Sequence, residues 1–421
     1  MIFFKLALKS LRNRLFTTVL TVVSIALSVA LLLSVERTRR VARDGFTNAI
    51  SQTDLIVGAR TGPLNLILYT VFNMGNATNN ISWQSFQEIK NNPAIDWVIP
   101  YSLGDSHKGF RVVATDENFY QHYQFRGNSR VEFSEGLPAL NIFDVVIGTE
   151  VKNKLKYNLG DQVIVTHGVT KGEGIQKHDD KPFKIVGILK PTGTAIDQTV
   201  YISLYGMEAI HMDWKNGLAP TQESSTLVSQ ITKENIRIDQ ITAFFLRTKS
   251  RIQTLGLQRN INEFETEPLM AIIPGATLSE LWNGLSQIET VLQIISLMVL
   301  AIGLVAMLSS LLAGLNERRR EMSILRSIGA SPVQIASLLV FESALLTAIG
   351  ILAGIIFQVL MFFVLSGWLE RTFGFYFIGS VLTATELFYI GLILVSGILV
   401  GLIPAIKSSQ TALKDGLTIK I

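Results

Sequence analysis

Four long apolar runs divide the chain. They cover residues 17–35, 288–315, 333–365 and 387–406, and each contains at most one charged residue. A helix rises about 1.5 Å per residue, so roughly 20 apolar residues cross the ~30 Å hydrocarbon layer of a membrane. The pattern therefore predicts four transmembrane helices, and an even number of spans places both termini on the same side.

The first apolar run admits a second interpretation. Residues 28–30, Ser-Val-Ala, loosely resemble the small-x-small cleavage site of a secretory signal peptide. The run is long for the apolar part of such a peptide, however, and three further spans follow it. We therefore favour an uncleaved membrane anchor.

Basic residues predict the orientation of the spans. They gather before the first run, in residues 316–326 and in the tail after residue 406. Loops rich in Lys and Arg stay in the cytoplasm, so both termini and the loop after the second span are expected there. Four arginines after the first span disagree with this pattern, although the rule weakens for long translocated domains. They are Arg37, Arg39, Arg40 and Arg43.

Residues 36–287 have the pattern of a soluble α+β domain. Short runs rich in Val, Ile and Phe, bounded by Gly, Pro or Asp, predict strands. They cover residues 53–59, 97–103, 109–116, 144–149, 161–168, 183–190, 199–204 and 241–248. Helical patterns lie between them at 82–92, 149–158 and 250–264. This mixture predicts an α+β fold in two lobes.

Helices connect this domain to the first two spans. Residues 36–50 continue the helical pattern of the first span, and residues 276–295 carry apolar side chains at helical spacing into the second. We expect the two helices to form a stalk.

The complete pattern predicts nine segments. They are a cytoplasmic N-terminal segment (1–16), a first span (17–35), an extracytoplasmic domain with stalk helices (36–287), a second span (288–315), a cytoplasmic helix and loop (316–332), a third span (333–365), a short extracytoplasmic loop (366–386), a fourth span (387–406) and a cytoplasmic tail (407–421).

Composition agrees with an integral membrane protein. The chain is 48% hydrophobic and 17% charged, against about 25% charged in soluble domains. The net charge of +4 comes from basic residues beside apolar runs, which does not indicate nucleic-acid binding. The chain contains no cysteine, which excludes disulfides, thiolate zinc sites and cysteine nucleophiles.

The sequence offers little catalytic chemistry. It contains no Gly-Lys dipeptide, which a phosphate-binding P-loop requires, so we predict that this chain is not itself an ATPase. His167 and His178 lie on one Gly-rich segment and are weak candidates for a transition-metal site. A solvated hairpin tip is the favoured interpretation, so the sequence predicts no metal site.

Three other features have structural and functional interpretations. The uncharged segment 62–80 is either a buried helix or a gating loop that contacts substrate. Small residues four apart, at Gly350 and Gly354 and at Gly397 and Gly401, permit close helix packing in lipid. Ser24 and Ser28 have the same spacing. The acids Glu289 and Glu342 are either functional, as acids within membrane spans often are, or exposed to the interface, which their places near span ends favour.

The charged segment between spans 2 and 3 reads NERRREMSILRSIGASPVQI. As a helix, it places Met322, Leu325, Ile328 and Gly329 on one side and most charges elsewhere. Gly329 is then a helix C-cap and Pro332 begins the next helix. Such a short amphipathic helix suits docking into a groove on a partner.

The run ERRREMSILRSIGAS (317–331) resembles the cytoplasmic signature of FtsX-like permeases, the membrane subunits of MacB/LolC/FtsX-type ABC systems. One span, a large outer domain and three spans follow the same order as in that family. Residues 146–165 and 183–204 are similar to the periplasmic core domain of MacB-type permeases.

The resemblance implies a permease subunit that works by mechanotransmission. A separate ABC ATPase, present in two copies, would bind ATP and Mg²⁺, and this chain would bind no cofactor. The segment after span 2 would be the ATPase-coupling element, with Glu317, Arg318, Arg319, Arg320, Glu321, Ser323, Ile324, Leu325, Arg326, Ile328, Gly329 and Ala330 as its residues. The permease would lie in the bacterial inner membrane among lipids, paired with a second copy or a paralogue.

Two functions remain open under this resemblance. The first is export or extraction of an envelope substrate such as a lipoprotein, which requires a periplasmic adaptor or chaperone. The second is transmembrane signalling without transport, in which ATP hydrolysis activates an extracytoplasmic partner such as a cell-wall hydrolase.

Overall fold

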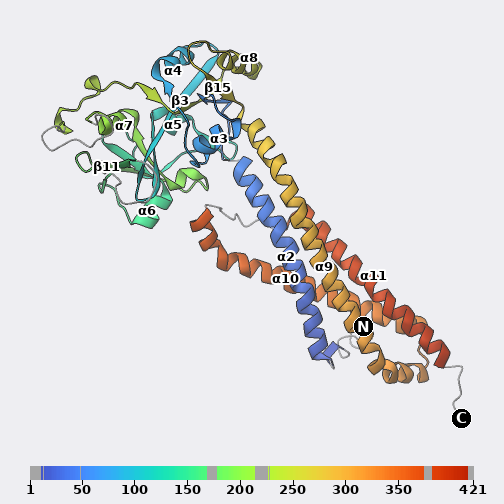
Figure 1. Ribbon diagram of the computed structural model, residues 1–421. Helices are drawn as coiled ribbons and strands as arrows, with labels where there is room; N and C mark the ends of the chain where they lie inside the picture. The colour runs from blue at the N-terminus through green and yellow to red at the C-terminus, as the bar shows by residue number, and fades with distance from the viewer. Residues whose placement is uncertain are drawn as a thin grey trace. The chain divides into compact units, whose positions relative to one another are not determined.

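The computed structural model describes residues 11–12, 14–47, 49–167, 178–213, 226, 228–373 and 382–415 (Figure 1). The chain divides into two compact units. The helical unit contains residues 1–41, 285–370 and 376–421, and the sheet unit contains residues 42–284 and 371–375.

Long helices build the helical unit. They are α2 (Leu15–Thr47), α9 (Pro274–Ser327), α10 (Pro332–Phe373) and α11 (Ala384–Asp415). Each contains a stretch long and apolar enough to cross a membrane: Leu15–Arg40, Ser286–Ala313, Pro332–Leu365 and Ala384–Ser408. The four predicted spans are confirmed. Helices α2 and α9 also continue beyond their apolar stretches, as the predicted stalk requires.

Two helix ends differ from the sequence prediction. Helix α10 continues to Phe373, through residues that were expected to form a loop, because residues 366–373 contain no proline to stop it. Helix α11 continues past Pro404 to Asp415. Proline removes one backbone donor, and neighbouring groups in membrane helices can tolerate that loss without a break.

Small residues allow α10 to approach α2 closely. A Cβ atom on Gly350 would lie 2.6 Å from Cγ2 of Ile25, and one on Gly354 would lie 2.7 Å from the carbonyl oxygen of Ala26. No larger side chain fits at either position without displacing α2. The Gly350–Gly354 spacing is therefore a helix contact.

The other small-residue spacings also lie at helix contacts. Gly397 and Gly401 of α11 face Thr347 and Ser343 of α10 so closely that an added Cβ would overlap both side chains. Between α2 and α9, the Ser28 hydroxyl lies 3.1 Å from the carbonyl oxygen of Val299. Small residues and serine hydroxyls thus provide the tight contacts that hold helices together in lipid.

Three arginines near the C-terminal end of α2 contact the other helices, and we call Arg37, Arg39 and Arg40 the arginine collar. Arg39 pairs with Glu36 at 2.9 Å and with Glu289 of α9 at 3.4 Å. Arg40 lies 3.6 Å from a carboxylate oxygen of Glu386 on α11.

The collar also reaches α10. The Arg37 guanidinium lies 5.5 Å from the centre of the Phe362 ring, within cation–π distance. Arg37, Arg39 and Arg40 therefore contact α9, α10 and α11 between them. This explains arginines on the predicted outer end of α2, where the positive-inside rule does not expect them, because their role is pairing between helices.

A mixed sheet forms the centre of the sheet unit. Eleven described strands belong to it, in the order β15-β1-β14-β3-β4-β12-β8-β11-β7, with β10 beside β3 and β9 beside β11. Their bounds are β1 (Leu55–Ala59), β3 (Ile95–His107), β4 (Phe110–Thr115), β7 (Phe133–Gly136), β8 (Asp144–Ile147), β9 (Gln162–Val163), β10 (Thr166–His167), β11 (Phe183–Leu189), β12 (Thr199–Ser203), β14 (Ala243–Thr248) and β15 (Leu269–Ile272).

Shorter elements complete the unit. The small strands are β2 (Ile81–Ser82), β13 (Gln240–Ile241), β5 (Gln124–Phe125) and β6 (Ser129–Arg130), and the helices are α3 (Pro63–Val71), α4 (Trp83–Lys90), α5 (Glu117–His122), α6 (Thr149–Leu155), α7 (Leu204–His211) and α8 (Arg251–Asn262). Short 3₁₀ turns occupy Ala195–Gln198, Val228–Gln230 and Lys233–Asn235.

Strand β3 joins two halves of the sheet. Its first part pairs with β14, as far as Tyr101 opposite Ala243, and its second part pairs with β4 from Ser102 onward. The two lobes expected from the sequence therefore share one continuous sheet within one compact unit.

Helices cover both faces of this sheet. Along β1, Leu55 and Val57 belong to the buried cluster that includes side chains of α4, α6, α7 and α8, while Ile56 belongs to the cluster of α3 and α5. This alternation follows from the two-residue period of a strand. Leu66 and Ile67 of α3 are fully buried, so the part of segment 62–80 that forms α3 is a buried helix.

Candidate functional site

The predicted coupling segment is the end of α9. The helix runs without interruption from Pro274 to Ser327, so the helix predicted from Glu317 onward is a continuation of α9. Residues 315–327 are mostly good helix formers and include neither proline nor glycine, so nothing stops the helix earlier.

A tight turn of residues 328–331 connects α9 to α10. Gly329 has a φ of 102°, a conformation that favours glycine, and its N–H donates to the Arg326 carbonyl at 2.9 Å. The Ser331 hydroxyl accepts from the Gln334 N–H at 3.3 Å, and the Gln334 side chain accepts from the Ser331 N–H at 2.8 Å. This reciprocal cap precedes Pro332, the first residue of α10. The predicted glycine stop and proline start are confirmed.

Apolar side chains are exposed on both sides of this turn. Ile324, Ile328 and Val333 are 52%, 79% and 76% exposed, and we call these three residues the apolar tip. Ile328 directly follows the last residue of α9, and its N–H donates to the Ile324 carbonyl at 3.3 Å, which keeps the two residues one turn apart. Met322, expected on the same face as Ile328, is instead half-buried, with its sulfur 2.9 Å from the Ser408 hydroxyl of α11.

The remaining coupling candidates are only partly defined. Arg326 and Ala330 are half-buried and Gly329 is exposed. The other predicted residues have helical backbones, but their side chains lie outside the described part of the structure: Glu317, Arg318, Arg319, Arg320, Glu321, Ser323 and Leu325.

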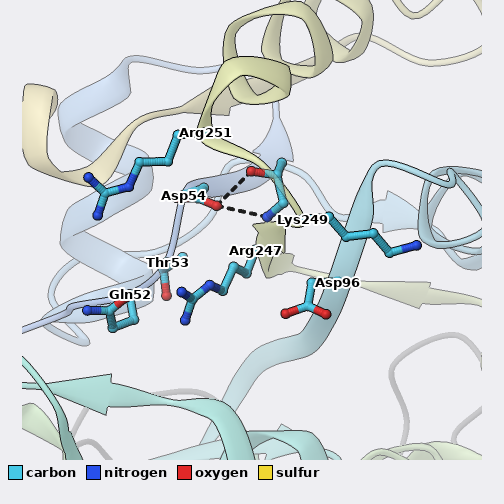
Figure 2. A pocket seen from close by; sticks show the side chains of 8 residues that line it. Gln52, Thr53, Asp54, Asp96, Arg247, Lys249 and Arg251 are labelled. Carbon is cyan, nitrogen blue, oxygen red and sulfur yellow. Dashed lines mark hydrogen bonds between the residues drawn. The ribbon is translucent and has the colours of Figure 1, made fainter.

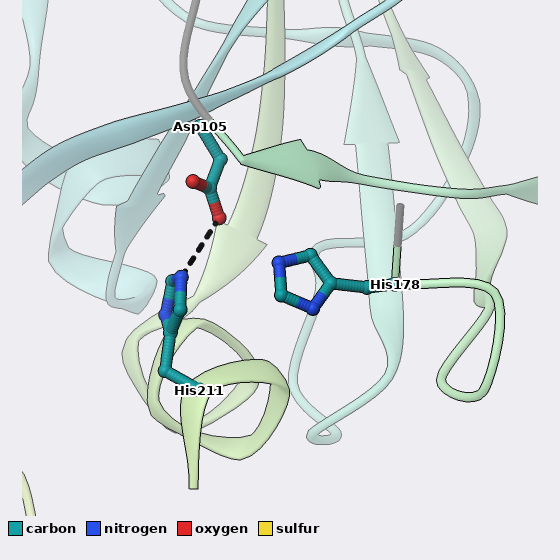
Figure 3. A group of neighbouring side chains, drawn as sticks. All are labelled: Asp105, His178 and His211. Atoms are coloured by element: carbon teal, nitrogen blue, oxygen red, sulfur yellow. Dashed lines mark ion pairs between the residues drawn. The ribbon is translucent and has the colours of Figure 1, made fainter. Parts of the chain in front are cut away.

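A histidine cluster lies in the sheet unit, with different partners from those expected (Figure 3). Asp105, His178 and His211 each offer one ligand atom, and these atoms lie within 4.8 Å of one another. The weak candidate His178 is thus joined by Asp105 and His211 among the described side chains. The backbone of His167 pairs with Asp105, and its side chain is not among those described.

No sequence signal connects these three residues. They come from β3, from the segment before β11 and from α7, and the sheet order alone brings those segments together. Of the three cluster residues, the sequence analysis identified only His178, because Asp105 and His211 are distant from it in the chain.

One carboxyl on α7 has a strongly shifted pKa. Burial raises the pKa of Glu208 to about 7, and the nearby Asp239 carboxylate contributes in the same direction. Glu208 lies one helical turn before His211. It is therefore a group of the sheet unit that changes charge near neutral pH.

A charged cavity of about 290 Å³ lies beside the start of β1 (Figure 2). Asp54 accepts hydrogen bonds from the N–H and hydroxyl of Thr248, both at 2.8 Å. Among the cations that line the cavity, Lys249 donates to the Pro93 carbonyl at 2.9 Å. These contacts connect β1, β14 and the segment before β3, so we assign this cavity a structural role.

A second cavity lies where α9 begins. It measures about 440 Å³ and is lined by residues from α8, β15 and the first turns of α9, including Gln258, Met270, Ala276 and Glu280. Any displacement of the start of α9 would change its shape.

Two family models match this chain. The MacB-like periplasmic core domain matches residues 18–250, and the FtsX-like permease C-terminal domain matches residues 293–413. The core domain precedes the permease domain along the chain, which is the order expected from the sequence.

Individual relatives are distant. An uncharacterized ABC transporter permease of Methanocaldococcus jannaschii is 24% identical over 205 residues, which are 49% of this chain and 45% of that protein. The alignment therefore spans less than half of this relative. Among solved structures, the extracellular domain of the noncanonic ABC-type transporter YknZ from Gram-positive bacteria matches 52% of this chain and 98% of its own, with 12% identity and a TM-score of 0.31.

The core-domain model alone covers more than half of the chain, and the permease model accounts for the three C-terminal spans. Together with four helices that are long and apolar enough to cross a membrane, these matches describe a multi-pass membrane protein of the ABC transporter permease type. The chain belongs to the family of FtsX-like, MacB-type ABC transporter permeases.

Proposed function

We propose that the chain couples ATP hydrolysis by a separate ATPase subunit to movement of the sheet unit on the outer side of the bacterial inner membrane. Both termini and the turn between α9 and α10 would then lie in the cytoplasm. Two ATPase copies and a second permease chain, identical or related, would complete the complex. The cargo would be an exported molecule or a lipoprotein drawn from the envelope.

Helix α9 is the observation that supports this proposal. Leu278, near its start, belongs to the buried core shared with α3 and α5, and Ser327 ends it beside the turn to α10. Between them lies the apolar stretch Ser286–Ala313. No proline follows Pro274 in this helix. An unbroken helix resists bending. A displacement of α9 at Ser327 would therefore be transmitted to the core around Leu278.

The apolar tip is the surface that we propose for ATPase docking. An amphipathic helix end that offers exposed isoleucines suits a hydrophobic groove on a partner. Burial of one isoleucine contributes roughly 1.5–3 kcal/mol.

In the main alternative, helix α9 transmits the same movement but no cargo is transported. Movement of the sheet unit would activate an extracytoplasmic hydrolase in place of handling a cargo with an adaptor or chaperone. Proteins that co-purify with the chain from native membranes distinguish the two, because an adaptor or chaperone supports transport and a hydrolase supports signalling.

The docking surface has a direct test. Ile328→Asp places a charge in the proposed groove, and we expect the amount of ATPase that co-purifies to fall at least tenfold, since about 1.4 kcal/mol corresponds to a factor of ten. Ile252→Asp is the matched control, because Ile252 is 90% exposed on α8 of the sheet unit. Equal ATPase recovery from both variants would show that the tip does not dock the ATPase.

A further inference from the structure

The cluster in Figure 3 brings together three side chains that commonly bind metals. Asp105 and His178 are fully buried, and His211 is half-buried at the end of α7. The rings of His178 and His211 are nearly perpendicular, at 85°, with centroids 5.2 Å apart. Figure 3 shows the three side chains turned toward one another.

Local backbone structure positions each of these residues. The β3–β4 register shifts between Leu103 and Ser106, so Asp105 lies in a bulge, an irregularity that redirects a side chain from its usual alternation. The N–H of His178 donates to the Val165 carbonyl at 3.0 Å, which fixes the start of its segment.

A backbone contact sets the tautomer of His211. Its Nδ1 lies 2.8 Å from the carbonyl oxygen of Met207, and a carbonyl can only accept, so Nδ1 carries the hydrogen. In the neutral ring, the lone pair is then on Nε2, which faces Asp105. Metal-binding histidines commonly show this arrangement, in which one ring nitrogen donates to a carbonyl and the other binds the ion.

The spacing of the ligand atoms fits a small cation. The Nε2 atom of His211 lies 3.4 Å from Oδ2 of Asp105, which is long for a charge-assisted hydrogen bond of about 2.7–2.9 Å. Two ligands on one tetrahedral Zn²⁺, each bound at about 2.0–2.1 Å, lie roughly 3.3 Å apart. The ligand atom of His178 lies within 4.8 Å of the other two.

We propose that Asp105, His178 and His211 bind a divalent transition-metal ion, with Zn²⁺ as the best match. Two imidazoles and one carboxylate suit Zn²⁺ and disfavour Mg²⁺ and Ca²⁺, which prefer oxygen ligands. Three protein ligands leave a fourth position for water or for a partner's side chain. The ion would join β3, α7 and the segment before β11.

The surrounding charges are compatible with this ion. Lys181 is buried, and its ammonium lies 2.6 Å from Asp213 and 3.5 Å from Asp180. These two acids and one base sum to −1, and the proposed ligands with Zn²⁺ sum to +1. The ion would therefore leave this buried region close to neutral, which lowers the cost of burial.

The test measures zinc binding to the full-length chain in detergent, with any affinity tag removed. After treatment with EDTA and desalting, ZnCl₂ is titrated in competition with a fluorescent chelator. We expect one Zn²⁺ per chain, no competition from Mg²⁺, and at least a tenfold loss of affinity in each of Asp105→Asn, His178→Ala and His211→Ala. His122→Ala is the matched control, because His122 stacks on Trp97 outside the cluster.

A second measurement does not depend on the variants. X-ray absorption at the zinc edge of the loaded wild-type chain should show two imidazole nitrogens and oxygen ligands at about 2.0–2.1 Å. Absence of stoichiometric zinc, a spectrum without imidazole, or equal affinity in the cluster variants and the control would each overturn the proposal.

Discussion

Glu208 is the residue whose charge state is expected to change near neutral pH. Burial, with a smaller contribution from Asp239, raises its pKa from 4.5 to about 7 in the folded chain. Between these values the folded chain binds a proton that the unfolded chain has lost. Stability therefore falls as pH rises through this window and levels off above it.

A Glu208→Gln variant tests this pH dependence. Glutamine cannot ionise, so the thermal midpoint of the variant should fall less between pH 4.5 and 7 than that of the wild type. The difference should be on the order of 1 kcal/mol, because Glu208 is only half-buried and solvent screens Asp239. Parallel pH profiles of wild type and variant would contradict the assignment.

Single residues differ in how far the sequence reveals their role. Gly329 and Pro332 were predictable because a helix stop and a helix start depend on backbone conformation within a few positions. Asp105 and His211 were not, because their proximity to His178 depends on the order of strands in a sheet. The contact of the Met322 sulfur with Ser408 of α11 was not predictable either, because it depends on packing between distant helices.

At the level of elements, the small-residue contact between α10 and α2 makes a sharp prediction. Gly354→Leu would force a side chain against the Ala26 carbonyl and Val29, and we expect a loss of roughly 1–3 kcal/mol in thermal unfolding. Gly391→Leu is the matched control, since a Cβ on Gly391 meets nothing within 4 Å. Equal stability of the two variants would mean that α10 does not pack on α2 through Gly354.

The elements themselves were largely predictable from local pattern. Most predicted strands and helices of the sheet unit occur, because apolar alternation and turn residues act over short distances. The run 161–168 was predicted as one strand but forms two, because β9 pairs with β11 and β10 pairs with β3. Strand β15 and helices α5 and α7 were not predicted from the sequence.

At the level of the whole molecule, a substitution at Gly284 tests whether α9 transmits movement along its length. Gly284→Pro should break the helix at a cost of about 3 kcal/mol or more, whereas Gly284→Ala should strengthen it slightly. Because the chain contains no cysteine, Leu255→Cys on the 65%-exposed Leu255 gives a single position for a fluorescent label on the sheet unit.

We expect the proline variant to bind the ATPase normally, because its apolar tip is unchanged. Its ATP-dependent change in label fluorescence should be lost, and the alanine variant should retain it. A full fluorescence response in the proline variant would remove α9 as the transmitting element.

The sequence predicted a membrane protein with four spans, but it did not predict the order of strands in the sheet. The four membrane spans were predictable because each depends only on the length and apolar composition of one continuous run. The order of eleven strands depends on pairings between distant segments, such as β15 with β1, which no local pattern encodes.

The arginine collar has a consequence for how the chain is made. Helix α2 is synthesised first, while Glu289 and Glu386, which neutralise Arg39 and Arg40, arrive with α9 and α11. The end of α2 would thus remain positively charged in the bilayer until the last helix has inserted. A chain that stalls before α11 would lack Glu386, and with it the ion pair that joins α2 to α11.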